Sequence, residues 1–427
     1  MPRLALGVDF GTSGVRVAVN DQTGETLIER GSPYPRPFED PEGWRSGFIA
    51  LILQLPLELR RNVAAVALAG TSGTVLLCRR DGSLLEGEMG LALPYHLACA
   101  EQMPEVRRLM GDPSHPAGQA SGSVARALRL LKRSQTSLPP SDLLIRHQAD
   151  WLMGWLLGTW HWGEEGNNLR LGWDLLRQRW LGDLPLAPWA RALPHIVASG
   201  SVLGAVAPAL ASALGLPEDC QVVAGTTDAN AAVLAADPSE VDGLTVLGST
   251  LVLKQIVPRP IQAAGVSCHR LNGRWLVGGA SNTGAGLLTR YFSPEQMEEL
   301  SRQIDANTRS RLNLRPLLSQ GERFPVDDPR LEPILGPRPV SDASFLQALL
   351  EGITAIEQQG WQRLRELGAP PIQRVITLGG GARNPRWRLM RERMLGLPVL
   401  NRPQLSAARG MARLAQGRME SSLPGPA

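Results

Sequence analysis

Two segments with the same plan, one in each half of the chain, constrain the fold most. The segment "LALGVDFGTSGVRVAV" begins at Leu4 and reads as a strand, a turn of Gly, Thr and Ser, and a second strand. The segment "GLTVLGSTLVLKQI" begins at Gly243, about 240 residues later, and repeats that plan. Residues of this kind form tight hairpin turns that a ligand can approach closely. The repetition predicts two related domains that face each other across a cleft, each offering one turn to the same phosphate chain.

The first hairpin combines an anion-binding turn with an acid. Successive N–H groups beside the hydroxyls of Thr12 and Ser13 form a concave anion site. Asp9 stands at the end of the preceding strand and faces the same space. It would repel a phosphate unless a cation lay between them, and Mg²⁺ favours carboxylates, waters and substrate phosphates. The competing interpretation is an ordinary surface hairpin, and this segment alone does not decide between the two.

Length and composition indicate a folded protein of more than one domain. The chain has 427 residues, which exceeds what one core normally organises, with 43% hydrophobic and 20% charged residues. No apolar run reaches the length of a membrane span, and "MPRLALGVDF" leads directly into a strand, so we expect no signal peptide. The four cysteines lack CxxC spacing, which suits a reducing, cytoplasmic compartment and no zinc site.

The charge pattern argues against a nucleic-acid partner. The formal net charge is +4, but the arginines are spread among acids rather than gathered in a stripe. The densest basic run, "RWRLMRERM", is interpreted as the solvated face of a helix.

The remaining pattern predicts alternating strands and helices. We expect helices over 41–60, 121–133 and 143–158, and a long polar loop over 161–174 of the kind that is often functional. A short strand over 220–225 precedes a helix with Thr and Asp at its start. A third Gly-rich turn in "ITLGGGARNPRWRLMRERM" stands between a strand and a helix, where backbone N–H groups can meet a ligand.

An ordered set of motifs carries a family resemblance over nearly the whole chain. The motifs are "DFGTSG", "HQADWL", "NNLRLGWD", "AGTTDANAA", "LGSTLVL", "GGASNTGAG", "LGGGARNP" and "AARGMARLA". Together they resemble the FGGY carbohydrate kinases of the actin/hexokinase-like superfamily. The resemblance implies an α/β fold of two duplicated RNase H-like domains flanking a central catalytic cleft, with an N-terminal domain over 1–232 and a C-terminal domain over 233–427. The segments "GGASNTGAG", "GERFP" and "ALLEGI" look most like the D-ribulose kinases of cyanobacteria and plants.

The resemblance also implies roles for individual residues. Asp228 matches the catalytic base, and Asp9 matches the acid that contacts the sugar and, directly or through water, Mg²⁺. The sugar pocket would include Asp9, Thr71, Ser72 and Asp228. ATP would be bound by Gly11, Thr12, Ser13, Gly248, Ser249, Thr250, Gly284, Gly380, Gly381 and Asn384.

Transfer of a γ-phosphoryl group to a sugar hydroxyl needs positioning, charge neutralisation and a base that accepts the hydroxyl proton. Asp228 precedes an Ala-rich helix, so its carboxylate is held at the cleft. The competing interpretation is an acid that complements the helix dipole. The residues alone favour this second interpretation, whereas the family resemblance favours the catalytic base. We interpret Asp150 as a buried acid bonded to backbone. We interpret Trp387 as a core residue, in preference to a residue that covers adenine.

Two departures from the family pattern bear on the substrate. Many members have a sugar-contacting acid where "LALPYHLAC" places His96, so either His96 substitutes or that contact is absent. The loop "HWGEEGNNLR" also differs, and Glu164 or Glu165 could compensate.

The sequence thus predicts an ATP- and Mg²⁺-dependent kinase of a free pentulose, D-ribulose before D-xylulose, acting as a monomer or homodimer without nucleic-acid or membrane partners. The alternatives from other classes are an inactive sugar or nucleotide sensor and, ranked lowest, an ATPase-driven chaperone.

Overall fold

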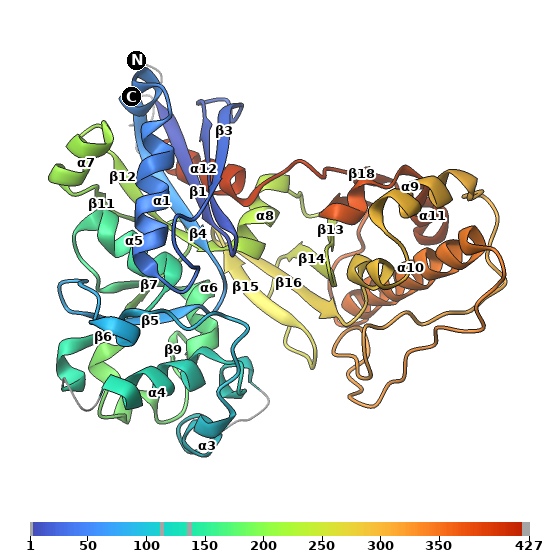
Figure 1. Ribbon diagram of the computed structural model, residues 1–427, viewed down its shortest axis with the longest axis horizontal. Helices are drawn as coiled ribbons and strands as arrows, with labels where there is room; N and C mark the ends of the chain where they lie inside the picture. The colour runs from blue at the N-terminus through green and yellow to red at the C-terminus, as the bar shows by residue number, and fades with distance from the viewer. Residues whose placement is uncertain (1–2, 112–114, 135–138, 421–427) are drawn as a thin grey trace. The chain divides into compact units, whose positions relative to one another are not determined.

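The computed structural model describes residues 3–111, 115–134 and 139–420 (Figure 1). Their contacts divide them into two compact units. Unit 1 gathers the described residues of 1–235, 270–273 and 406–427, and unit 2 those of 236–269 and 274–405. This partition differs from the predicted domains 1–232 and 233–427, because helix α12 (Ala407–Glu420) packs on strands β1 and β4 of unit 1. Gly7 permits this packing, since a Cβ there would lie 2.0 Å from the Ala408 carbonyl oxygen.

Unit 1 is built on a six-stranded mixed sheet in the order β11-β12-β4-β1-β2-β3. The strands are β1 (Leu4–Phe10), β2 (Gly14–Asn20), β3 (Thr26–Pro33), β4 (Val63–Gly70), β11 (Val202–Ala205) and β12 (Gln221–Thr227). Strands β1, β4 and β12 run parallel, whereas β2, β3 and β11 are antiparallel to their neighbours. The carboxyl ends of β1, β4 and β12 therefore lie at one edge of the sheet, where ligands of open α/β sheets bind.

Two large hydrophobic clusters stabilise the described part of unit 1, and a small third one joins Ala18 to Ala408 and Ala412 of α12. The first joins the sheet to helices α1 (Pro41–Leu53) and α5 (Gln148–Leu157), with the eight residues of β4 all buried. The second lies around the antiparallel strands β5 (Val75–Arg79) and β6 (Leu143–His147) and the helices α3 (Met103–Met110) and α4 (Ser123–Ser134). Shorter elements complete the unit: α2 (Leu57–Arg60), β7 (Trp162–Glu164), α6 (Glu165–Asn168), β8 (Trp173–Asp174), β9 (Arg179–Trp180), β10 (His195–Val197), α7 (Pro208–Leu214) and α8 (Asp228–Ala236).

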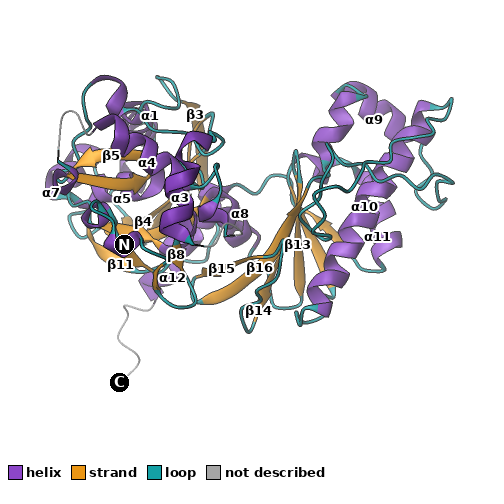
Figure 2. Ribbon diagram, turned by 90° about the horizontal axis from the view of Figure 1, so that it is seen from below, coloured by secondary structure: helices purple, strands orange, loops and turns teal. Residues whose placement is uncertain are grey.

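Five of the six strands of unit 2 repeat an arrangement found in unit 1, whereas the sixth strand, β11 in unit 1 and β15 in unit 2, is added at opposite edges of the two sheets. Its sheet has the order β15-β16-β14-β13-β17-β18, and helices α10 and α11 pack together beside it (Figure 2). Like β1, the inner strand β13 has an antiparallel hairpin partner on one side and a parallel strand on the other. The elements are β13 (Asp242–Leu247), β14 (Leu251–Val257), β15 (Ser267–Leu271), β16 (Arg274–Ser281), α9 (Pro294–Gln303), α10 (Asp342–Glu366), β17 (Arg374–Leu378), α11 (Pro385–Leu395) and β18 (Val399–Asn401).

Four predicted segments fold differently from expectation. The expected helix 41–60 is interrupted before Leu57, at Pro56, and forms α1 and α2. The expected helix 143–158 is strand β6 followed by α5, because its first half pairs with β5. The expected polar loop 161–174 contains β7, α6 and β8, and most of its polar residues are buried. The basic run of α11 is not wholly solvated, since Arg391 is buried against Glu357 at 2.6 Å. No helix within the described ranges is long and apolar enough to cross a membrane.

Candidate functional site

Three predicted site residues meet at the carboxyl edge of the unit 1 sheet. Asp9 of β1 is paired with Ala69 of β4, one residue before β4 ends and two before Thr71. Strand β12 runs alongside β4 to the same edge, and Asp228 begins α8 directly after it. The parallel register therefore gathers Asp9, Thr71 and Asp228, which stand far apart in the sequence.

The surroundings of the Asp9 carboxyl group disfavour its ionised form. Burial, reinforced by the nearby Asp228 carboxylate, raises the pKa of Asp9 to about 7. One of its carboxylate oxygens, Oδ1, is buried and has no hydrogen-bond partner within the described residues. An unpartnered buried oxygen is costly, and a ligand hydroxyl or a cation would satisfy it.

Asp228 lies at the start of α8 with a half-buried side chain. Burial raises its pKa, and the Ala229 N–H, which donates to Oδ1 at 2.7 Å, and the Arg170 guanidinium oppose that rise. A raised pKa makes this carboxylate a stronger proton acceptor than an ordinary aspartate.

The turn after β4 is held by residues that the sequence did not single out. Thr71 donates through its N–H and its hydroxyl to Gln148 Oε1, at 2.9 and 2.8 Å. Gly73 accepts from Nε of Arg126 at 3.0 Å. Thr71 thus fixes the turn and is buried, whereas Ser72 is partly exposed and free to face a substrate.

Arg126 connects this turn to the segment around His96. Its Nη1 donates to the carbonyl oxygens of Tyr95 and Leu97 at 3.0 and 2.8 Å, and its side chain is fully buried. Burial and the neighbouring Arg170 lower the pKa of Arg126 to about 10. His96 itself is exposed.

The first predicted phosphate turn is an ordered hairpin. Gly11 N–H donates to the Gly14 carbonyl at 3.0 Å, and the Tyr34 hydroxyl donates to the Gly11 carbonyl at 2.8 Å. Thr12 and Ser13 at its tip are exposed and accessible to a ligand.

In unit 2, the second predicted phosphate turn is enclosed by glycines. Ala285 N–H donates to the Gly248 carbonyl at 2.9 Å. A Cβ on Gly284 would lie 2.5 Å from the Ser249 carbonyl oxygen, so only glycine allows this close approach. Gly379, in the third turn, has φ +86°, and a Cβ at this position would lie 2.7 Å from the Leu247 carbonyl oxygen. Glycine therefore allows both the backbone conformation and the close approach.

Gly380 and Gly381 follow at the end of β17, and a Cβ on Gly380 would meet open space. Gly381, in contrast, packs on Leu247. The structure therefore brings together the predicted positions from the three glycine-containing turns of unit 2.

Asn384 is occupied as a helix cap. Its Oδ1 accepts from the Trp387 N–H at 3.0 Å and its Nδ2 donates to Ser301 Oγ at 2.9 Å. Trp387 is 1% exposed, and its Nε1 donates to Thr354 Oγ1, which confirms its interpretation as a core residue.

Asp150, Glu164 and Glu165 have structural partners. Asp150 accepts from the Glu164 N–H at 2.9 Å, which confirms that it is a buried acid bonded to backbone. Glu164 caps α6 through the Gly166 N–H, and burial raises its pKa to about 8. Glu165 forms an ion pair with Arg270 at 2.6 Å. Both glutamates proposed to replace a missing sugar contact therefore already have partners.

The donor set fits a hydrated Mg²⁺. No group of three or more His, Cys, Asp or Glu side chains that could hold a metal occurs in the part of the chain that the structure describes. Mg²⁺ is usually held by one or two carboxylates with waters and substrate phosphates. The unpartnered Oδ1 of Asp9, with Asp228 nearby, matches that requirement.

Comparison with known proteins finds similarity to sugar kinases. Residues 248–417 match the C-terminal domain of the FGGY family of carbohydrate kinases. The xylulose kinases of Escherichia coli (strain K12) and Bacillus subtilis (strain 168) are each 24% identical, over 96% and 97% of this chain and 89% and 88% of their own.

Solved structures share the fold across almost the entire chain. A xylulose kinase from Rhodospirillum rubrum has a TM-score of 0.80 at 20% identity and covers 99% of this chain and 91% of its own. A Plasmodium falciparum glycerol kinase with ADP has a TM-score of 0.80 at 14% identity, with the same coverage. A gluconate kinase from Lactobacillus acidophilus has a TM-score of 0.79 at 16% identity, covering 99% and 91%. The chain thus shares the two-domain α/β fold of these kinases, its residues 248–417 are similar to the FGGY C-terminal domain, and xylulose kinases are among its relatives.

Proposed function

We propose that the protein is an ATP- and Mg²⁺-dependent kinase of a free pentulose, with D-ribulose as its substrate. The observation that carries the proposal is the meeting of Asp9 and Asp228 at one sheet edge, where burial raises the pKa of both carboxylates. Two interacting acids beside a hydroxyl-bearing turn suit a reaction that moves both a proton and a phosphoryl group.

In this reaction the oxygen of a terminal sugar hydroxyl forms a bond to the γ-phosphorus of ATP. The bond from that phosphorus to the β,γ-bridging oxygen breaks, and ADP leaves with the electron pair. Asp228 accepts the hydroxyl proton, while Ser72 and the turn anchored by Gln148 and Arg126 orient the sugar. Mg²⁺, when bound at Asp9, supplies neutralisation of the charge on the phosphates.

The phosphates would be bound by Gly11–Ser13 and Gly248–Thr250, and the nucleoside by the surroundings of Gly284, Gly380, Gly381 and Asn384. Exposed hydroxyls and backbone at both hairpin tips support this assignment. The five strands that correspond in the two sheets support an origin by duplication of an RNase H-like domain.

D-Xylulose is the second candidate substrate, because homologues that span the chain are xylulose kinases. D-Ribulose and D-xylulose are epimers, so a few polar contacts separate them. The segments "GGASNTGAG", "GERFP" and "ALLEGI" favour D-ribulose.

The test is ADP release measured by a coupled assay with D-ribulose, D-xylulose, glycerol and gluconate, with Mg²⁺ or with excess chelator. We expect the highest kcat/KM for D-ribulose, a lower value for D-xylulose and no turnover with chelator. A preference for glycerol or gluconate would overturn the substrate. Calorimetric binding of sugar and ATP without ADP release would instead identify a sensor.

A further inference from the structure

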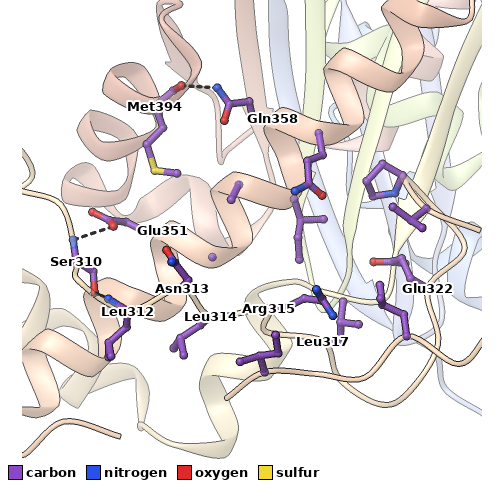
Figure 3. A pocket seen from close by; sticks show the side chains of 18 of the residues that line it. Ser310, Leu312, Asn313, Leu314, Arg315, Leu317, Glu322, Glu351, Gln358 and Met394 are labelled. Carbon is purple, nitrogen blue, oxygen red and sulfur yellow. Dashed lines mark hydrogen bonds between the residues drawn. The ribbon is translucent and has the colours of Figure 1, made fainter. Parts of the chain in front are cut away.

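Unit 2 contains a cavity of about 750 Å³ that is distinct from the predicted nucleotide turns (Figure 3). One wall is a face of α10, from Glu351 to Gln359, with Met394 at the end of α11 beside it. The opposite wall is the irregular segment 309–334. Ligand sites for small molecules commonly have volumes of about 300–1,000 Å³, so the cavity is of suitable size.

Hydrogen bonds hold the irregular wall in place. Leu318 N–H donates to the Asn282 carbonyl at 2.8 Å, and the Thr283 hydroxyl donates to the Pro316 carbonyl. Glu322 Oε1 accepts from the Asn282 N–H at 2.7 Å. The segment is thus fastened to the end of β16, and the cavity is formed before any ligand arrives.

Much of the lining is apolar. It includes Leu312, Leu314, Leu317, Leu331, Ile334 and Ile356. Ile334 is 41% exposed, although burial of an isoleucine is favourable. A ligand with an apolar body would cover this surface.

The charged groups of the lining leave an excess of positive charge. Glu351 is paired with Arg393 at 2.6 Å and also accepts from the Ser310 N–H at 2.9 Å. The two remaining arginines of the lining, Arg309 and Arg315, form no ion pair with any residue that the structure describes.

The other acid of the lining, Glu322, is buried at 4% exposure. Its oxygens accept from the Ser281 hydroxyl and from the N–H groups of Asn282 and Arg323. Both acids of the lining are therefore satisfied internally. Arg315 Nη1 donates to the Glu332 carbonyl at 3.1 Å, but neither Arg309 nor Arg315 has an acid partner among the described residues, so both charges can attract an anionic ligand.

We propose that this cavity binds a small amphipathic monoanion, with an aliphatic or aromatic body against the leucines and a carboxylate or sulfonate at Arg309 and Arg315. Arginine suits such groups because its fork of N–H donors matches their oxygens. The proposal does not depend on the reaction at Asp9 and Asp228, and its test needs no turnover.

The probe is 8-anilinonaphthalene-1-sulfonate, an aromatic sulfonate whose fluorescence rises in apolar surroundings. The full chain is titrated as wild type and as Arg315→Gln, which removes the charge, and Ala355→Trp, which fills the cavity from α10. Arg330→Gln is the control, since Arg330 is exposed on the same segment outside the lining. We expect saturable binding that weakens at least tenfold in both cavity variants and is unchanged in the control.

Competition experiments distinguish recognition of the negative charge from non-specific hydrophobic binding. Octanoate should displace the probe, and 1-octanol at equal concentration should displace it at least tenfold less well. Absence of saturable binding, equal affinity in Ala355→Trp, or equal displacement by 1-octanol would each overturn the proposal. Circular dichroism confirms that each variant is folded, and either cavity variant alone suffices for the test.

Discussion

The buried surroundings of Asp9 and the nearby Asp228 carboxylate stabilise the protonated form of Asp9. The same two features would favour a cation beside the ionised form. Burial and the Asp228 carboxylate raise the pKa of Asp9 from 3.8 to about 7, so between these values the folded state holds a proton that the unfolded state releases. Stability attributable to Asp9 is therefore present at low pH and lost as pH rises through this window.

Asp9→Asn removes this pH-dependent loss. Since one pKa unit corresponds to about 1.4 kcal/mol, we expect the variant to be more stable than wild type by at least ~1 kcal/mol at pH 8 and by much less at pH 4. Denaturant unfolding at both pH values measures the difference. Asp21→Asn is the control of opposite sign, because hydrogen bonds from Thr23 lower the pKa of Asp21. Equal effects of Asp9→Asn at both pH values would show that its charge is not penalised.

Arg126 is predicted to position the sugar side of the site without touching the nucleotide. Arg126→Met leaves the Tyr95 and Leu97 carbonyls without the donor that Arg126 supplies, and each buried unpaired group costs about 1–3 kcal/mol. We expect KM for the sugar to rise about tenfold or more, with KM for ATP nearly unchanged. Arg129→Met, on the same helix but 30% exposed, is the control. A parallel rise in both KM values would indicate general loss of structure.

At the scale of elements, local pattern predicted the two hairpins and the junction of β12 with α8, because their turns and periodicity lie within short segments. The apolar run over 143–158 was predicted wrongly, since period alone does not separate a buried strand from a buried helix. The supports of the sugar turn were not predictable from local pattern. Gln148 and Arg126 reach it from 77 and 53 residues away in sequence, and only the fold brings them there.

The glycines of unit 2 allow a test of the nucleotide turn. Gly284→Ala places a methyl group 2.5 Å from the Ser249 carbonyl oxygen, and we expect a loss of about 1–3 kcal/mol of stability, as for overpacking. Gly380→Ala meets no atom within 4 Å, so its stability should change by less than about 0.5 kcal/mol. If the nucleoside lies at Gly380, the added methyl group should weaken the binding of a non-hydrolysable ATP analogue, measured by calorimetry, although the stability of the variant is nearly unchanged. Wild-type affinity in Gly380→Ala would remove Gly380 from the site.

At the scale of the whole molecule, the hydrophobic clusters of the two units share no residue. Separate cores predict two transitions in scanning calorimetry. Because Asp9, Ser72 and Asp228 all belong to unit 1, D-ribulose at 100 times its Kd should stabilise one transition by about 2.7 kcal/mol and leave the other unchanged. Identical shifts of both transitions with sugar alone would contradict this division.

The central claim is that Asp228 accepts the proton of a sugar hydroxyl, and the most direct measurement compares kcat and ligand affinity in wild type and Asp228→Asn. Asparagine keeps the shape and can hydrogen-bond the sugar, but it cannot accept the proton. We expect kcat for D-ribulose to fall roughly 10²–10⁴-fold, the range for loss of a general base. The Kd values of sugar and ATP analogue should change only a few-fold, because both hairpin turns remain intact. Retention of more than about a tenth of the wild-type kcat would contradict the account, since general-base loss costs at least a hundredfold.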